Sequence, residues 1–523
     1  MMRRKKLLCI SMTIALLLTG CGSSKKESVS YDKANMEMTD CEIQSCKEEF
    51  KIANDNFNTE EYDTIQENRF LSVKNNALST FSADVDTASY SNVRRMIKEG
   101  YVDRNAIRTE EFINYFHYDY AKPENDNPFQ TTTEIMDCPW NKDTKLLSIG
   151  IKAKDMDYEN LPDSNIVFLL DVSGSMNSPD KLPLMISAFK MLSEHLNSRD
   201  RISIVTYAGS DQVLLEGCDG NDQYRINSAL ENVMAGGSTN GSAGIETAYK
   251  LAEKYYIKGG NNRVILATDG DLNIGLTSES ELDKLIRKKA KSGVFLSVLG
   301  LGTGNIKDNK METLADNGNG NYSYIDSILE AKKVLVEEMG GTLFTVAKDV
   351  KFQVEFNPAK LKGYRLIGYE NRLLNAEDFE DDTKDAGEIG AGHCVTALYE
   401  LVPIGSKMDI KESDLKYQDS KQRSDSASDE WLTVNIRYKE PDSDSSQLLT
   451  YPVTTAAYSD NPTNDFKFAS CVAEFAMLLR ESEYVGNATY DHVINRLKQL
   501  DNIENDPYKK EFVELVKMAK ELE

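Results

Sequence analysis

Short apolar runs alternate with amphipathic stretches between residues 165 and 341. Mostly apolar runs at 166–172, 201–207 and 263–268 predict strands that are covered on both faces, as in a parallel sheet. Between them apolar side chains recur at helical spacing, for instance over 182–196. This alternation predicts an α/β fold with a doubly wound, mostly parallel sheet and right-handed crossovers. The other strands expected here are 212–215, 294–299 and 322–325, and the other helices are 222–233, 243–255, 280–291, 310–317 and 329–339.

The residues on either side of this α/β unit follow different patterns. Residues 342–460 hold strand-like runs with no helices between them and predict a β-rich domain, while residues 461–523 predict a C-terminal helical region. Residues 71–164 mix helices and strands. Their strands either form a separate domain or join the later ones in a β-sandwich-like region flanking the α/β unit, and we expect the second arrangement. The expected strands are 79–86, 132–136, 146–152, 350–356, 364–369, 394–402, 432–438 and 448–453, and the expected helices are 89–99, 109–116, 468–481 and 490–499.

The N-terminus has the features of an export signal. A basic segment at 3–6 precedes an apolar segment at 7–18, which is too short for a permanent transmembrane helix. It ends in Leu18-Thr19-Gly20-Cys21, which resembles the lipobox of bacterial lipoproteins. The resemblance implies that residues 1–20 are a removed signal peptide and that Cys21 is lipidated, so we expect a lipid anchor on the extracytoplasmic face of the cell membrane. The alternative is an ordinary cleaved signal followed by a chance cysteine.

Composition limits the class of partner and the chemistry that the cysteines can perform. Residues 21–70 are polar and poor in apolar side chains, which predicts an acidic flexible tether. The formal net charge of −24 argues against a nucleic acid partner, because phosphates would be repelled. Cys41 and Cys46 are close enough in sequence to form a disulfide in an exported protein. The other cysteines and the four histidines show no zinc-ligand spacing.

Three loops of the α/β unit carry oxygen-bearing side chains. The first follows the apolar run at 166–170 and holds Asp171, Ser173 and Ser175. The second, just before the helix expected at 243, holds Thr239, and the third holds Asp269 directly after a strand. Because the carboxyl ends of parallel strands share one edge of a sheet, we expect the three loops to meet there. Carboxylate and hydroxyl oxygens suit hard cations such as Mg²⁺ or Ca²⁺.

With these loops in this order, residues 165–341 resemble the von Willebrand factor type A domain with its metal-ion-dependent adhesion site. The resemblance implies a divalent cofactor, usually Mg²⁺, with Ca²⁺ or Mn²⁺ as alternatives. It also implies an open coordination position, which an acidic side chain of a protein partner fills. The ligand positions that it implies, some of them acting through water, are Asp171, Ser173, Ser175, Thr239 and Asp269.

Motifs outside the metal loops extend the resemblance. They are Ser79-Thr80-Phe81-Ser82, Asp84-Val85-Asp86-Thr87-Ala88-Ser89-Tyr90, Pro139-Trp140-Asn141, Gly259-Gly260-Asn261-Asn262-Arg263, Lys348-Asp349-Val350-Lys351, Gly363-Tyr364-Arg365-Leu366-Ile367-Gly368-Tyr369-Glu370-Asn371-Arg372 and Asp385-Ala386-Gly387-Glu388-Ile389-Gly390-Ala391-Gly392-His393. Together they look like those of the YfbK-like family of bacterial lipoproteins. This likeness covers most of residues 71–523 and implies the same architecture.

These features predict a membrane-anchored binding protein whose metal site serves protein–protein interaction or adhesion. An envelope assembly or scaffold factor that uses the same site is the alternative, and a metal-dependent hydrolase is a weaker one. A hydrolase needs a base or a nucleophile beside the metal, but no histidine lies in the three loops and Ser173 lacks a GxSxG elbow. We therefore expect no enzymatic activity. The aromatic-rich segment at 112–120 is expected to pack the N-terminal region onto its neighbour.

Overall fold

The computed structural model describes residues 59–523, apart from 84–85, 125–126, 156–161, 238–240, 271–278, 339–340, 342–343, 385, 412–427, 442, 444 and 502. Residues 1–58 lie outside the described part, and with them the predicted signal peptide, the lipidation position Cys21 and the Cys41–Cys46 pair. Within the described part, no helix combines the length and the apolar character needed to cross a membrane.

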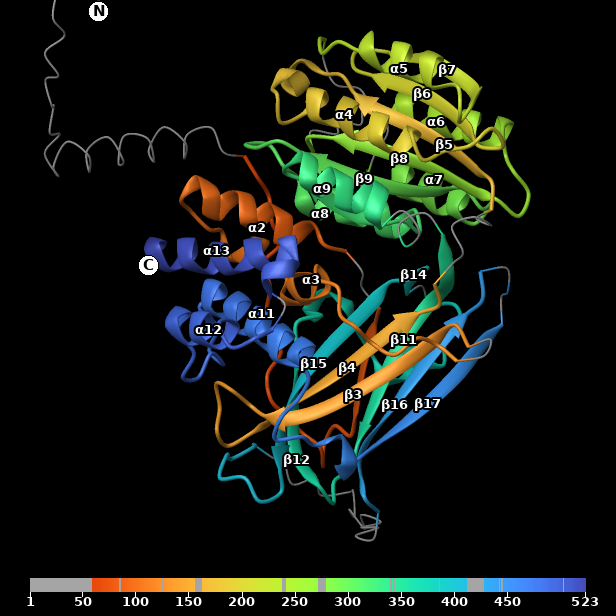
Figure 1. Cartoon of the computed structure of the whole chain (residues 1–523). Helices are drawn as coiled ribbons and strands as arrows, with labels where there is room; N and C mark the ends of the chain where they lie inside the picture. Colours follow the sequence, from red (N-terminus) through yellow and green to blue (C-terminus); the bar gives the residue numbers. More distant parts are fainter. Residues whose placement is uncertain are drawn as a thin grey trace, which may run out of the picture. The chain divides into compact units, whose positions relative to one another are not determined.

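The α/β unit is built on a six-stranded sheet with the strand order β10-β9-β8-β5-β6-β7 (Figure 1). Neighbouring strands run parallel, except that β7 is antiparallel to β6. The doubly wound, mostly parallel sheet predicted from the hydrophobic pattern is therefore confirmed. The strands are β5 (Ser164–Asp171), β6 (Arg201–Tyr207), β7 (Asp211–Asp219), β8 (Asn261–Thr268), β9 (Phe295–Leu301) and β10 (Tyr322–Ile325).

Helices cover both faces of this sheet because the central strand buries side chains in both directions. In β5, Phe168 packs into a core with α4, α5 and α9, while its neighbour Leu169 packs into a core with α6, α7 and α8. The continuous apolar run of β5 is thus a direct consequence of a sheet buried on both faces. The helices are α4 (Leu182–Ser193), α5 (Gln223–Glu231), α6 (Gly241–Lys254), α7 (Glu279–Ala290), α8 (Asp308–Asn317) and α9 (Ile328–Lys332), which continues as one π-helical turn, η4 (Lys333–Glu337).

Two antiparallel sheets form a sandwich around a common apolar core. Their strand orders are β1-β12-β15-β4-β3 and β13-β2-β11-β16-β17, with β14 paired to β11. Each sheet takes strands from before and after the α/β unit in sequence, since β2 pairs with β11 and β4 pairs with β15. The strands are β1 (Leu71–Ser72), β2 (Leu78–Ser82), β3 (Phe129–Asp137), β4 (Lys145–Ala153), β11 (Thr345–Phe356), β12 (Leu361–Ile367), β13 (Leu373–Leu374), β14 (Gly387–Gly390), β15 (Cys394–Pro403), β16 (Glu430–Lys439) and β17 (Ser446–Thr454).

A helical cluster joins the N-terminal region to the C-terminus through one aromatic core. The ring centroids of Phe116 and Phe468 lie 4.9 Å apart, and Phe112 contacts Phe475. The packing role predicted for the aromatic segment at 112–120 is therefore confirmed. The helices are α2 (Ala88–Glu99), α3 (Thr109–Asn114), α11 (Asn464–Arg480), α12 (Tyr490–Leu497) and α13 (Pro507–Leu522), and the 3₁₀ turns are η1 (Arg104–Ala106), η3 (Gly174–Asn177), η5 (Glu370–Arg372), η6 (Ala376–Phe379), η7 (Thr455–Ala457) and η8 (Ile503–Asn505).

The folded part begins earlier in the sequence than predicted. The sequence assigns residues 59–70 to the flexible tether, but this segment makes specific hydrogen bonds to distant parts of the chain. Gly304 donates its backbone N–H to Glu60 Oε1 at 2.9 Å, and Asn68 donates to the Gly368 carbonyl at 2.8 Å. Polar contacts hold this segment in place, which is why the hydrophobic pattern does not reveal it.

Candidate metal centre

Two buried carboxylates come together at the edge of the α/β unit's sheet where its parallel strands end. Asp171 is the last residue of β5, and Asp269 follows the last residue of β8, the parallel neighbour of β5. Both side chains have no solvent exposure. Two like charges in one buried place are unfavourable unless cations compensate them, and among the described side chains Lys181 pairs with Asp269 and not with Asp171.

Hydroxyl groups complete the first loop around these carboxylates. The Ser173 backbone N–H donates to Asp171 Oδ1 at 2.8 Å, and the Oγ atoms of Ser173 and Ser175 lie 3.0 Å apart. Ser173 is buried and Ser175 is exposed. The Ser175 side chain also hydrogen-bonds to Asp269. The structure therefore brings Asp171, Ser173, Ser175 and Asp269 together at one point of the rim.

The second loop meets the first through its backbone. Gly236 donates its N–H to the Val172 carbonyl at 2.7 Å, and Gly174 donates to the Gly237 carbonyl at 3.1 Å. The fifth predicted ligand position, Thr239, lies two residues further on and is outside the described residues. The backbone bonds place the start of the second loop beside the first, and the contact between Ser175 and Asp269 places the first beside the start of the third.

The environment of Asp171 disfavours its charged form. Burial raises the pKa of Asp171 to about 6, and the nearby Asp269 carboxylate adds to the rise, although the Ser173 N–H and hydroxyl oppose it. Tyr207 and Thr268 donate hydroxyl groups to Asp171 Oδ2 at 3.3 and 3.2 Å. A nearby cation would favour the carboxylate form, as at metal sites in general.

Asp269 differs because it has a cationic neighbour. Burial acts to raise the pKa of Asp269, but the Lys181 ammonium, together with hydrogen bonds from Ser175 and Asn305, lowers it overall. Lys181 Nζ donates to Asp269 Oδ2 at 2.9 Å. Lys181 cannot be identified from the sequence, since a lone lysine before a helix carries no pattern that separates it from a surface residue.

The third loop is shaped by the segment at 302–307, which connects β9 to α8. Gly270 adopts φ +98°, and a Cβ atom there would lie 2.6 Å from the Lys307 backbone nitrogen. The Asn305 side chain hydrogen-bonds to Asp269. The position of the Asp269 loop therefore depends on how this connecting segment is held.

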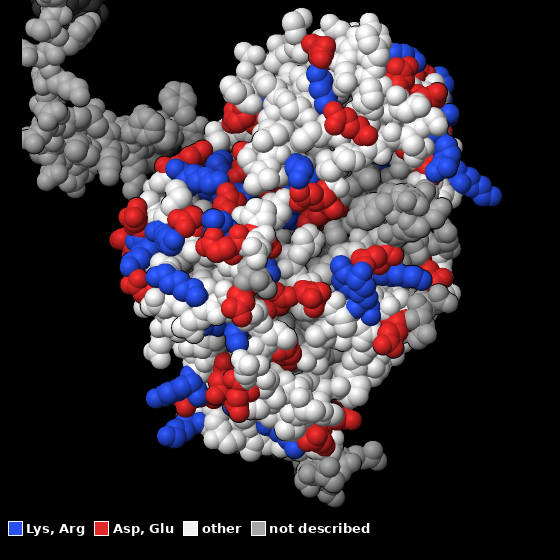
Figure 2. Space-filling view, in the orientation of Figure 1, with Lys and Arg blue, Asp and Glu red and all other residues white. Residues whose placement is uncertain are grey.

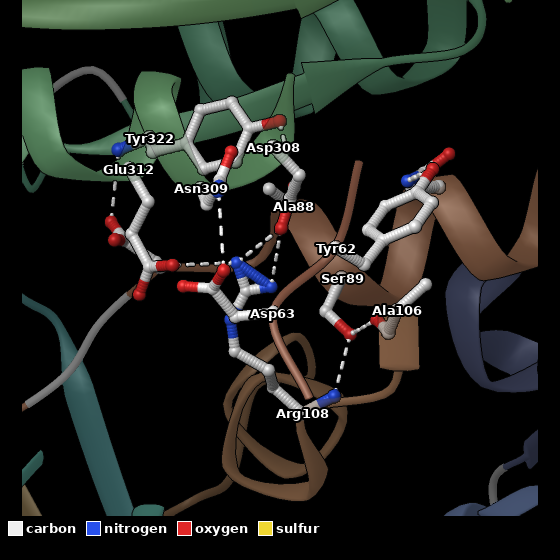
Figure 3. A network of polar contacts seen from close by, with 12 residues as sticks. Tyr62, Asp63, Ala88, Ser89, Ala106, Arg108, Asp308, Asn309, Glu312 and Tyr322 are labelled. Atoms are coloured by element: carbon white, nitrogen blue, oxygen red, sulfur yellow. Dashed lines mark hydrogen bonds and ion pairs between the residues drawn. The ribbon is translucent and has the colours of Figure 1, made fainter. Parts of the chain in front are cut away.

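Arg108 fixes the end of that segment from outside the α/β unit (Figure 3). Its guanidinium donates to Asp308 Oδ2 at 2.7 and 2.5 Å and to Glu312 Oε2 at 2.8 Å. Tyr322 donates its hydroxyl to the other Asp308 oxygen at 2.9 Å. Arg108 is buried, so these are strong charge-assisted bonds shielded from water.

The segment beginning at Thr59 holds the same connection from its other side. Thr59 and Glu61 donate backbone N–H groups to the carbonyls of Gly304 and Ile306 at 2.8 and 2.9 Å, in the manner of an added strand. Lys307 Nζ donates a hydrogen bond to the Thr59 carbonyl at 2.6 Å. Residues near the end of the predicted tether are thus bonded to the segment that supports the candidate site.

Other chemistry predicted from composition can be placed as well. The four cysteines in the described residues, Cys138, Cys218, Cys394 and Cys471, are free thiols. The described residues hold no group of three or more His, Cys, Asp or Glu side chains arranged for a metal ion, so the candidate site depends on its serine hydroxyls as well as its carboxylates. On the face drawn in Figure 2, acidic side chains (red) and basic side chains (blue) are intermixed. Neither sign of charge dominates the described part of that face, so a ligand of one charge is not favoured by the surface as a whole.

Comparisons with known proteins cover the same regions. The family model described as von Willebrand factor type A domain matches residues 165–337, the one described as Uncharacterized protein YfbK, C-terminal, matches 341–522, and one described as von Willebrand factor matches 56–148. Two solved structures that resemble the chain are a von Willebrand factor type A protein from Catenulispora acidiphila (12% identity, TM-score 0.40, 77% of this chain and 91% of that one) and the ArnB paralog VWA2 from Sulfolobus acidocaldarius (16%, 0.37, 76% and 98%).

A curated relative matches nearly the whole chain. The protein YfbK of Escherichia coli (strain K12) is 42% identical over 470 residues, which cover 88% of this chain and 81% of YfbK. The matched length includes the type A domain as well as the regions on both sides of it. The chain therefore belongs to the YfbK family, and its central α/β unit is a von Willebrand factor type A domain.

Proposed function

We propose that the rim of the type A domain binds a divalent cation, Mg²⁺ in the first instance, and uses it to hold a carboxylate of a protein partner. The observation that carries this proposal is the meeting of Asp171 and Asp269, both fully buried, with the hydroxyls of Ser173 and Ser175. Oxygen donors of this kind match the coordination chemistry of Mg²⁺ and Ca²⁺.

The donor set fits a cation better than it fits a purely structural role. Burial and a second carboxylate raise the pKa of Asp171 to about 6, so the charge of Asp171 lacks compensation without a cation. Replacing one such carboxylate by an apolar group would be the simpler structural solution. Two carboxylates and two hydroxyls would fill only part of the coordination shell of Mg²⁺ or Ca²⁺, which takes about six or more oxygen ligands, so a position would stay open for a further oxygen.

Each residue has a distinct part in the proposed binding. Asp171 and Asp269 supply the negative charge, Ser173 and Ser175 supply neutral oxygens, and the Tyr207 hydroxyl orients the Asp171 carboxylate. The exposed Ser175 marks the side from which a partner approaches. The cation, when bound, supplies the Lewis acidity that attracts the partner's carboxylate.

In this proposal the metal site works on the outer side of the cell membrane. Cys21 would carry a lipid, and residues between it and Thr59 would connect the membrane to the folded part on the extracytoplasmic face. The metal site would then be presented to partners outside the cell membrane. The described part of the rim carries no histidine that could act as a general base, which supports binding rather than hydrolysis.

Affinity capture tests this function. The full chain is immobilised and exposed to solubilised envelope proteins in Mg²⁺ or in EDTA, and the captured proteins are compared. We expect Mg²⁺-dependent capture by the wild type and by the control Asp163→Asn, which changes a carboxylate at an exposed ion pair with Arg199. Asp171→Asn should lose the capture while keeping its circular dichroism spectrum. Equal capture by Asp171→Asn in EDTA would refute the proposal.

A further inference from the structure

Lys181 occupies a defined place beside the candidate site. It precedes α4, and its ammonium donates to Asp269 Oδ2 at 2.9 Å. Lysine side chains are rarely buried unless they are paired, and this one is only 7% exposed. The contact is therefore an internal ion pair rather than a surface one.

The fold makes room for the lysine stem. A Cβ atom on Gly302 would lie 2.0 Å from Lys181 Cε, and Gly302 adopts φ +69°. The Gly302 carbonyl is in turn fixed by the buried Tyr324 hydroxyl, which donates to it at 2.6 Å. A side chain at position 302 would displace the lysine, so the path to Asp269 exists because this position is glycine.

We propose that Lys181 is a built-in counter-cation, which weakens metal binding at the site and strengthens the grip of the metal-loaded site on an anionic group. The proposal rests on the function proposed above and names the residue that sets the balance between its two steps. Lys181 competes directly for Asp269 Oδ2, and its charge also opposes the approach of a divalent cation.

The charges of the described side chains explain both directions of the effect. Two carboxylates, Asp171 and Asp269, would neutralise a divalent ion completely, leaving little attraction for a further carboxylate. With the Lys181 ammonium present, the loaded site keeps one positive charge in excess. A positively charged, partly enclosed site attracts an anion more strongly than a neutral one.

Calorimetry on the full chain tests the first direction. Mg²⁺ is titrated into chelator-treated wild type, Lys181→Met, Lys181→Gln and the control Lys190→Met, which removes a lysine of α4 that pairs with Glu231 instead. We expect both Lys181 variants to bind Mg²⁺ about tenfold more tightly than the wild type. The control should match the wild type. Lys181→Gln removes the charge but keeps a polar side chain. It therefore tests the effect of the charge even if Lys181→Met misfolds.

Fluorine NMR with fluoroacetate as the anion probe tests the second direction. At saturating Mg²⁺ the wild type should broaden the fluoroacetate signal, and the Lys181 variants should broaden it severalfold less. Unchanged Mg²⁺ dissociation constants in both variants, or undiminished fluoroacetate binding, would overturn the role of Lys181 alone. If no protein, wild type included, binds Mg²⁺, the proposed function itself fails and the role of Lys181 fails with it.

Discussion

The two buried carboxylates at the rim, Asp171 and Asp269, lie in opposite electrostatic environments. Asp171 lies among hydroxyl donors and beside another carboxylate, whereas Asp269 has an ammonium group as a direct neighbour. The pKa of Asp171 rises to about 6 because of burial, while that of Asp269 falls despite burial, because Lys181 and its hydrogen-bonding neighbours favour the carboxylate. Asp171 is therefore the residue at which the need for a cation is most readily measured.

Replacing Asp171 by asparagine should stabilise the metal-free protein. The folded-state pKa of Asp171 lies above its ordinary value, so its contribution to stability is present at low pH and is lost as pH rises through about 6. At pH 7 in EDTA we expect Asp171→Asn to raise the free energy of unfolding by about 1–3 kcal/mol. Mg²⁺ should then stabilise the wild type but not the variant. Urea unfolding with and without Mg²⁺ measures both effects, and a variant less stable than wild type in EDTA would contradict the argument.

Metal affinity should depend on pH through the same carboxylate. Below the pKa of about 6, a proton occupies Asp171 in the metal-free protein and has to leave before a cation can bind. Mg²⁺ affinity should therefore be nearly constant above pH 7 and fall by about tenfold per pH unit well below pH 6. Calorimetric titrations at several pH values measure this dependence. A flat affinity between pH 5 and 7 would contradict the protonation of Asp171 in the metal-free protein over this range.

At the scale of elements, the hydrophobic pattern predicts the parallel strands of the sheet well and the antiparallel edge strand β7 less well. The strands expected at 201–207 and 322–325 match β6 and β10 to the residue, because both are almost entirely buried and rich in β-branched and aromatic side chains. The edge strand β7 is longer than expected, since its polar residues and the register shifts in its pairing with β6 disrupt the pattern. The helix expected at 329–339 is α-helical only over α9 and continues as a π-turn.

The candidate site is predictable to the same extent as the strands that present it. Asp171, Ser173, Ser175 and Asp269 meet because parallel strands end at one edge. Lys181 is not predictable, because its role depends on Gly302, more than a hundred residues away in sequence. The same holds for Glu60 and its neighbours, whose hydrogen bonds reach residues still more distant along the chain.

A substitution at Gly270 should disturb the site without touching a ligand. An alanine there must adopt φ +98° and would place its Cβ 2.6 Å from the Lys307 nitrogen, so the supporting segment must move. The matched control is Gly259→Ala, at φ +73° with open space around the added atom. Both should lose about 1–2 kcal/mol of stability from the backbone conformation. Only Gly270→Ala should also weaken Mg²⁺ binding in calorimetry, and equal affinities in both variants would contradict the coupling.

For the molecule as a whole, buried ion pairs join the type A domain to the regions on both sides of it in sequence. Arg94 bonds to Asp326 and Glu330 of the type A domain and to Glu511 of α13, and Arg108 bonds to Asp308 and Glu312. A sequence pattern treats an arginine on a helix as a surface residue, which is why these contacts escape prediction. Because of these ion pairs, the position of the rim depends on Arg94 and Arg108, which lie outside the type A domain.

Removing Arg108 should weaken the whole fold. Arg108→Met leaves the carboxylates of Asp308, Glu312 and Glu111 without their shared cation, and breaking a buried pair costs about 3–5 kcal/mol. Arg199→Met, which removes an exposed pair with Asp163, should change stability by less than about 0.5 kcal/mol. Urea unfolding followed by circular dichroism measures the difference. Similar unfolding midpoints for the two variants would show that Arg108 is not needed.

Electron paramagnetic resonance with Mn²⁺ tests the central claim most directly, because it counts free and bound ions without a partner. Titrated into chelator-treated full chain, Mn²⁺ should bind at about one ion per chain in the wild type. The control Asp163→Asn should bind likewise. Asp171→Asn should bind no Mn²⁺, so the signal of free Mn²⁺ should equal that of the same solution without protein. Binding of the same stoichiometry and affinity by Asp171→Asn, or no binding by the wild type, would contradict a metal site at the rim of the type A domain.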